Sequence, residues 1–182
     1  MMLISKNQSS DFDDELEICA DRFGISFPEE LVRFLRKYNG GETPNTTFSI
    51  NGISSDVKAF YGLGRVKHSY SSIKMKDHGS HRYLPIALDS FGNDIVIDVN
   101  SGKVFFNDHE MNSISPLADS IGEFISKCNS IPVNPAMGKS VEERELELIQ
   151  RGRGNVISNE LRKMWQAEID KYSSLHLEQV EL

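Results

Sequence analysis

The stretch that decides the fold covers residues 83–110 and reads YLPIALDSFGNDIVIDVNSGKVFFNDHE. Three runs rich in β-branched and aromatic residues predict strands near 84–88, 94–99 and 103–107. The turns at Gly92 and Gly102 are too short for a parallel crossover, so the strands should pair as an antiparallel meander. Side chains of the middle strand alternate between two faces, apolar on one (Ile95, Ile97, Val99) and mostly polar on the other (Asp94, Val96, Asp98). This pattern predicts one buried face and one solvated face.

Helical and strand patterns flank this meander on both sides. Helices are predicted over 11–22 and from Pro28 to Tyr38, and shorter strands over 46–50 and 57–61. A further helix is predicted from about Pro116 with Ser115 as its cap. The predicted fold class is α+β: an antiparallel meander of about five to six strands bracketed by helices, with a helical C-terminal extension.

Further short blocks accompany the meander: Phe27-Pro28, Tyr38-Asn39-Gly40-Gly41, Phe60-Tyr61-Gly62-Leu63, Leu117-Ala118-Asp119-Ser120-Ile121 and Glu123-Phe124-Ile125. Their order and spacing over about residues 12–128 resemble the SMI1/KNR4 (SUKH) family. Phe27, Ile121 and Gly122 depart from the family pattern, and these departures change only the size of core residues. The resemblance implies an α+β binding scaffold, used in bacteria as the immunity partner of polymorphic or contact-dependent toxins.

The chain is long enough for one domain with an appendage. Residues 1–10 are predicted to form a flexible arm, 11–130 the SMI1/KNR4-like domain, and 131–182 a helical extension docked on the core. Pro132 and Pro135 interrupt helical structure at the boundary. Beyond it, Ser140 and Glu143 form a capping-box pattern, and an apolar stripe over 158–172 predicts a last helix. The alternation over 175–182 is typical of an edge strand, which could also pair two copies in a homodimer.

The N-terminus lacks the apolar core of a secretory signal, and no apolar run approaches the roughly 20 residues of a membrane span. Cys19 and Cys128 fall on predicted apolar helix faces. These features predict a cytoplasmic protein with two buried thiols.

The formal net charge is −7, and residues 1–130 carry 18 acidic against 13 basic side chains. Such a surface disfavours direct binding to nucleic acid and favours a basic protein partner. Solubility alone would explain the same charge. No membrane partner is predicted, since no apolar run is long enough to span a membrane.

Histidines near carboxylates are the strongest candidates for chemistry. His78, His81 and His109 with Asp108 and Glu110 could hold a metal, but their spacing matches no established metal motif. Asp89 or Asp108 could act as a base with His109, yet nothing in the sequence indicates a perturbed pKa. The Gly62-Leu63-Gly64 segment lacks the third glycine of a dinucleotide site. We therefore predict no catalytic, metal-binding or cofactor-binding residue, and a protein that is not an enzyme.

A partner-binding surface is instead predicted around the turns of the meander, from acidic and aromatic side chains: Tyr61, Tyr83, Asp89, Phe91, Asp94, Asp98, Asp108 and Glu110. The alternatives are turn aspartates that accept backbone N–H groups and a Phe91 ring packed over the sheet edge.

The predicted function is that of a bacterial immunity protein that binds a cognate basic toxin domain, with nucleases as one candidate class, and occludes its active site. The alternative from another class is a non-catalytic regulatory or scaffolding module. A metal-dependent hydrolase is the third hypothesis.

Overall fold

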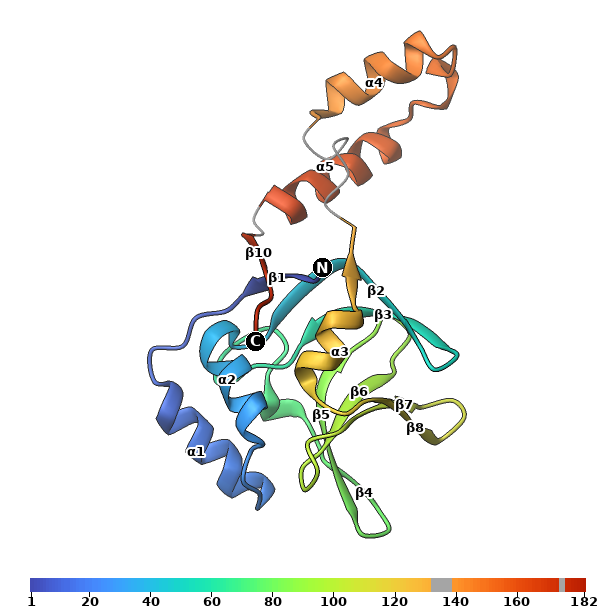
Figure 1. Cartoon of the computed structure of the whole chain (residues 1–182). Coiled ribbons are helices and arrows are strands. Elements are labelled where there is room, and N and C mark those ends of the chain that lie inside the picture. Colours follow the sequence, from blue (N-terminus) through green and yellow to red (C-terminus); the bar gives the residue numbers. More distant parts are fainter. Residues whose placement is uncertain (132–138, 174–175) are drawn as a thin grey trace. The chain divides into compact units, whose positions relative to one another are not determined.

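The computed structural model describes residues 1–131, 139–173 and 176–182. The chain divides into two compact units, Met1–Ile131 with Leu177–Leu182 (the main unit) and Pro132–His176 (the helical unit). A strongly curled sheet forms the main unit, and α2 and α3 lie against it (Figure 1). The predicted α+β class is therefore confirmed.

Ten strands form the sheet, more than the five to six that the sequence predicted. They are β1 (Leu3–Lys6), β2 (Gly41–Ile50), β3 (Ile53–Phe60), β4 (Lys76–His78), β5 (His81–Leu88), β6 (Asp94–Asp98), β7 (Val104–Asp108), β8 (Ser113–Ala118), β9 (Asn129–Ser130) and β10 (Leu177–Gln179). Their order is β10-β1-β2-β3-β5-β6-β7-β8, with β4 beside β5 and β9 beside β2. All the named strands pair antiparallel, and the short hairpin turns from β4 to β8 and between β2 and β3 require it for those pairs.

Three helices belong to the main unit: α1 (Phe12–Phe23), α2 (Glu29–Tyr38) and α3 (Ile121–Lys127). Helix α2 buries the apolar stripe that its sequence predicted, including Phe34 and Tyr38. The Glu30 carboxylate of α2 accepts the Ile121 and Gly122 N–H groups, 2.9 and 3.1 Å away. It therefore satisfies free N–H groups at the start of α3 and ties the two helices together.

Two glycines explain why the blocks around Asn39 and Gly62 occur together. Asn39 ends α2 in the left-handed conformation, and its amide oxygen accepts the Leu63 N–H at 2.7 Å. A Cβ on Gly62 would lie 2.2 Å from the Asn39 carbonyl oxygen, and one on Gly40 would lie 2.6 Å from the Tyr61 backbone. Only glycine permits this approach of two backbone segments.

The structure corrects the prediction for the helix at Pro116. Residues Ser113–Ala118 form β8, and α3 begins at Ile121 with the Ser120 hydroxyl accepting the Glu123 N–H. Ser120 precedes an apolar residue as Ser115 does, but only Ser115 was considered as a cap. Pairing of β8 with β7 decided between them.

The predicted flexible arm over 1–10 contains a strand instead. The β1 strand pairs with β2 on one side and β10 on the other, and the Ile4 side chain is fully buried. The edge strand predicted near the C-terminus is confirmed at Leu177–Gln179. Strands β1 and β10, which are far apart in sequence, thus pair with each other in one sheet. Hydrophobic periodicity within either segment cannot reveal this pairing.

The prediction of one solvated face on β6 is wrong. Val96 is fully buried, and so is nearly all of the Asp98 side chain. Val96 lies opposite Pro85 and Phe105 on the neighbouring strands. The curl of the sheet and these cross-strand neighbours cover the second face as well.

The helical unit contains α4 (Val141–Gln150), a 3₁₀ turn η3 (Gly154–Val156) and α5 (Asn159–Ser173). The capping box at Ser140 and Glu143 is confirmed, since both of its hydrogen bonds are present. The boundary predicted at Pro132 and Pro135, the Tyr172 side chain and Leu175 lie outside the described residues. None of the described helices is long and apolar enough to cross a membrane.

Candidate functional site

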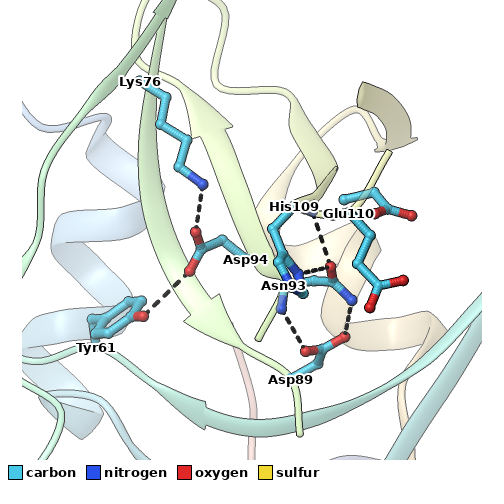
Figure 2. A network of polar contacts seen from close by, with 8 residues as sticks. Tyr61, Lys76, Asp89, Asn93, Asp94, His109 and Glu110 are labelled. Carbon is cyan, nitrogen blue, oxygen red and sulfur yellow. Dashed lines mark hydrogen bonds and ion pairs between the residues drawn. The ribbon is translucent and has the colours of Figure 1, made fainter. Parts of the chain in front are cut away.

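Two loops meet at one end of the meander, the β5–β6 loop (89–93) and the β7–β8 loop (109–112). Consecutive antiparallel hairpins turn at alternate ends, so these two loops share an end while the β6–β7 turn lies at the other. The Asn93 amide oxygen accepts the His109 N–H at 3.1 Å and lies 2.8 Å from His109 Nδ1 (Figure 2). The two loops therefore form one connected surface.

The buried Asp89 side chain fixes the conformation of the β5–β6 loop. Its side chain is 2% exposed and accepts the Phe91 and Asn93 N–H groups, each at 2.8 Å. Its second oxygen accepts the Ser55 hydroxyl and the Asn93 amide, again at 2.8 Å. Burial alone would raise the pKa of this carboxyl, but the hydrogen bonds from Asn93, Ser55 and Phe91 outweigh burial and hold the pKa below its usual value.

The neighbouring turns are braced in the same way. Asp56 on β3 accepts both the Ser90 N–H at 3.0 Å and the Ser90 hydroxyl. Asp108 at the end of β7 accepts the Glu110 and Met111 N–H groups, each at 2.9 Å. Short aspartate side chains are well suited to such turns. These hydrogen bonds consequently hold both loops in a defined conformation.

Two apolar side chains project from these fixed loops. Phe91 is 72% exposed and Met111 is 75% exposed, although both are large apolar residues. We define the loop surface as Asp56, Phe91, Asp108, Glu110 and Met111. Exposed large apolar groups on a rigid support are typical of recognition surfaces.

An open groove borders the loop surface on one side. Phe91 and Asp56 line it together with the Phe48 ring. Polar residues of β2 and β3, the last residue of α3 and the first residue of β9 complete the lining: Thr47, Ser49, Ser54, Ser55, Lys127 and Asn129. Its volume is about 850 Å³. An open groove of this kind suits a protein segment better than an enclosed small molecule.

Asp94 belongs to a separate polar cluster at the start of β6. Its carboxylate accepts the Lys76 ammonium at 2.8 Å and the Tyr61 hydroxyl at 3.3 Å (Figure 2). Tyr61 is 8% exposed, and its ring packs 5.9 Å from the Tyr70 ring. Burial, followed by the Asp94 charge, raises the pKa of Tyr61 strongly. Tyr61 therefore supports the site but offers little contact area, contrary to the prediction.

Asp98 and Tyr83 lie at the opposite end of β6, paired with each other in register. Asp98 accepts the Ser101 hydroxyl at 2.7 Å and lies 3.1 Å from His81 Nδ1. Burial raises its pKa, but these two contacts and the Asn100 N–H more than reverse the effect and lower it. Tyr83 is 5% exposed. Because both are buried and distant along the strand, neither belongs to the loop surface.

The histidines considered for a metal site are divided between these two ends. His78 pairs with His81 across β4 and β5, whereas His109 bonds to Asn93 at the loop surface. Within residues 1–131, 139–173 and 176–182, no group of three or more histidine, cysteine, aspartate or glutamate side chains could hold a metal ion.

Comparison with known proteins identifies the family of this chain. The model of the SMI1/KNR4 family (SUKH-1) matches residues 13–127, well over half of the chain. The chain belongs to this family. It is also 30% identical over 146 residues to the SPbeta prophage-derived uncharacterized protein YokK of Bacillus subtilis (strain 168), an alignment covering 65% of this chain and 73% of that protein. No solved structure matches the chain.

Within this SMI1/KNR4 platform, sequence reasoning missed two members of the loop surface. Met111 follows a glutamate in a turn, where an apolar residue has little reason to occur, and that mismatch is a signal that could have been used. Asp56 carries no comparable signal. It is 33 residues before Asp89, and only the packing of β3 against the β5–β6 loop brings it there.

Proposed function

We propose that this SMI1/KNR4 protein is an immunity protein that binds a cognate basic toxin domain and neutralises it by covering the active site. The loop surface is the proposed contact. The observation that carries the proposal is the pair of exposed apolar side chains, Phe91 and Met111, on loops held rigid by Asp89 and Asp108. The protein forms and breaks no covalent bond in this role.

Pre-ordered loops support tight binding. A loop that is already fixed loses little conformational entropy when it meets a partner, so more of the contact energy appears as affinity. Phe91 would enter an apolar pocket of the toxin, and Met111 would adapt to its rim. An interface of the standard total size, about 1,600 Å², would suffice for nanomolar affinity.

Charge supports a basic partner. Asp56 is bonded to Ser90, next to Phe91, and Asp108 and Glu110 lie next to Met111. Among the described residues, none of these three acids forms an ion pair. The whole chain has a formal net charge of −7. Complementary charge accelerates encounter and is screened by salt, so the association rate should fall as ionic strength rises. A nuclease, which is basic where it holds nucleic acid, is one partner class with this chemistry.

The proposed compartment is the bacterial cytoplasm. Cys19 and Cys128 are both buried and unpaired. Burial raises the pKa of the Cys128 thiol to about 12, so this thiol stays protonated and unreactive. Unpaired buried thiols suit a reducing compartment, where an immunity protein would meet a toxin that has entered the cell.

Co-expression with the toxin-like protein encoded beside this chain tests the proposal. Cells that carry both should grow, and the two proteins should copurify as a complex whose toxin activity is blocked at equal molar amounts. Growth arrest together with no complex would refute the proposal for that partner.

Matched variants test the surface itself. Phe91→Ala and Glu110→Lys should weaken binding, the first by about 30-fold or more if Phe91 is a central anchor. The controls are Ile18→Ala and Glu17→Lys, which alter an exposed apolar residue and an exposed acid beside it on α1. Equal effects of the two pairs would remove the loop surface from the proposal while leaving the immunity role open.

The same surface could serve a regulatory module that docks on a cellular enzyme. In that case the partner would be a resident protein, and deleting this chain would change that protein's activity without any toxin present. Identification of the adjacent reading frame separates the two functions.

A further inference from the structure

The helical unit is less well packed than the main unit. Helices α4 and α5 contact each other through the ion pairs Arg144–Glu168, at 2.9 Å, and Arg162–Glu145. No residue of α4 is buried. Two short helices in water are marginally stable unless an apolar face is covered by something else. A further contact is therefore needed to complete this unit.

Helix α4 has two distinct faces. One face contacts α5 through Arg144 and Glu145. The half-buried Val141 and Leu148 share that face with them at the spacing i, i+3, i+4, i+7. The other presents Leu146 and Ile149, which are three residues apart and each 56% exposed. Glu142 lies one turn before Leu146 on this same side. Two adjacent, exposed apolar side chains on one side of a short helix indicate a contact surface.

The charges of this region are divided along its length. Helix α4 carries four glutamates and one arginine, Arg144. The residues just beyond its end include Arg151 and Arg153, both exposed. An acidic start and a basic end complement each other when two copies run in opposite directions.

We propose that α4 is a homodimerisation helix, which pairs antiparallel with α4 of a second copy. A two-fold axis between Glu147 and Leu148 places Leu146 of each copy against Ile149 of the other. The same register places Glu142 opposite Arg153 at both ends. Such an interface is self-complementary, as a two-fold contact must be.

A second copy fits this face better than the main unit does. Residues 1–130 carry 18 acidic and 13 basic side chains, so the acidic α4 has no general electrostatic attraction to that surface. The antiparallel pair, by contrast, neutralises its own charges. A helix of ten residues is about 15 Å long, so the interface is small and the dimer should dissociate in the micromolar range.

Sedimentation velocity of the full chain from about 1 to about 500 μM should show a monomer–dimer equilibrium, because that range brackets a micromolar dissociation constant. Leu146→Glu should weaken the dimer at least about tenfold. Met164→Glu, which alters a 61% exposed residue on α5, is the matched control and should leave the dimer intact. Far-UV circular dichroism checks that the helices persist in each variant.

A charge exchange tests the register. Glu142→Arg and Arg153→Glu should each weaken the dimer, and the double variant should restore it, because each restored pair forms between copies. A chain that stays monomeric at every concentration would overturn the proposal in favour of docking on the main unit. A dimer unaffected by Leu146→Glu would overturn it in favour of pairing through β10. Binding of α4 to the toxin instead would appear as toxin affinity lost in Leu146→Glu without any dimer in the wild type.

Discussion

The main unit and the helical unit are stabilised in different ways. The main unit packs large side chains from helices and sheet into one core, with Phe34, Tyr38, Phe60 and Phe124 almost fully buried. Helix α4 has no fully buried residue and is held to α5 by two ion pairs, of which Arg162–Glu145 is partly exposed and Arg144–Glu168 joins a largely covered guanidinium to a partly exposed carboxylate. Surface ion pairs contribute little stability, whereas apolar burial contributes most of it. We therefore expect the main unit to be the more stable of the two, because it has the larger apolar core.

The family match and the loop surface also distinguish the two units. The SMI1/KNR4 model matches residues 13–127, which lie within the main unit, and the loop surface lies there too. A packed core keeps the loops in position, as the proposed binding of a partner requires. The helical unit lies outside the matched region, so its contacts can differ between family members without disturbing the platform.

The largest effect is expected for Phe34→Ala in the main unit. Phe34 is 1% exposed and packs 4.8 Å from the Phe60 ring and 5.3 Å from the Tyr38 ring. The cavity and the lost burial should cost about 3–5 kcal/mol of unfolding free energy. Urea denaturation followed by near-UV circular dichroism measures this, since four of the five tyrosines belong to the main unit. A loss below about 1 kcal/mol would contradict the idea of a single tightly packed core.

The sequence predicted the elements of the main unit because local patterns define them. Pro28, the apolar stripe and Asn39 mark both ends of α2, and the glycine turns define the β5–β6–β7 meander. The start of α3 was misplaced since Ser115 and Ser120 look alike locally, and only pairing with β7 distinguishes them. Strand β1 was missed because its partners are β2 and the distant β10.

The site was only partly predictable for the same reason. Phe91 and Glu110 were correctly placed in turns, and Asp108 is the strand residue that precedes one, because turn chemistry is local. Tyr61 and Tyr83 were predicted as members of the partner-binding surface, but both are buried, Tyr61 against the Tyr70 ring and Tyr83 against the Phe105 ring. Sequence spacing gives the face of a strand. It does not tell whether that face is covered.

The next effect in size concerns Asp89, which joins the core to the loop surface. Asp89→Ala leaves the Phe91 and Asn93 N–H groups and the Ser55 hydroxyl without their acceptor. Loss of these partners should cost about 1–3 kcal/mol. Urea denaturation measures the loss, and hydrogen exchange should show faster exchange in residues 89–93 with little change in α2. Unchanged exchange in the loop would show that Asp89 does not brace it.

Acid provides an independent test of the same residue. Because the pKa of Asp89 is lower in the folded chain than in the unfolded chain, its charge stabilises the protein above the unfolded pKa, about 4. That contribution is lost as the pH falls through the folded value. The stability difference between the wild type and Asp89→Asn should therefore shrink below about pH 4. Asp14→Asn, at an exposed position on α1, controls for the removal of a charge.

A smaller effect is expected in the helical unit. Leu148→Ala removes a half-buried side chain from the α4–α5 contact and should change the main-unit transition by less than about 0.5 kcal/mol. Trp165, the single tryptophan, is in α5 and reports on this unit by fluorescence. Its transition should occur at lower urea than the near-UV signal and shift further down in Leu148→Ala. Coincident transitions in both proteins would show that the two units unfold as one.

The smallest effect on stability is expected for Phe91→Ala. Its ring is 72% exposed, so truncation removes little buried area and should change the unfolding free energy by less than about 0.5 kcal/mol. The same chemical change at Phe34 is expected to cost several times more, which makes the two phenylalanines a matched pair within one unit. If Phe91→Ala weakens partner binding without altering stability, its exposed ring serves recognition. A loss above about 1 kcal/mol would instead show that the ring packs on the sheet edge and stabilises the fold.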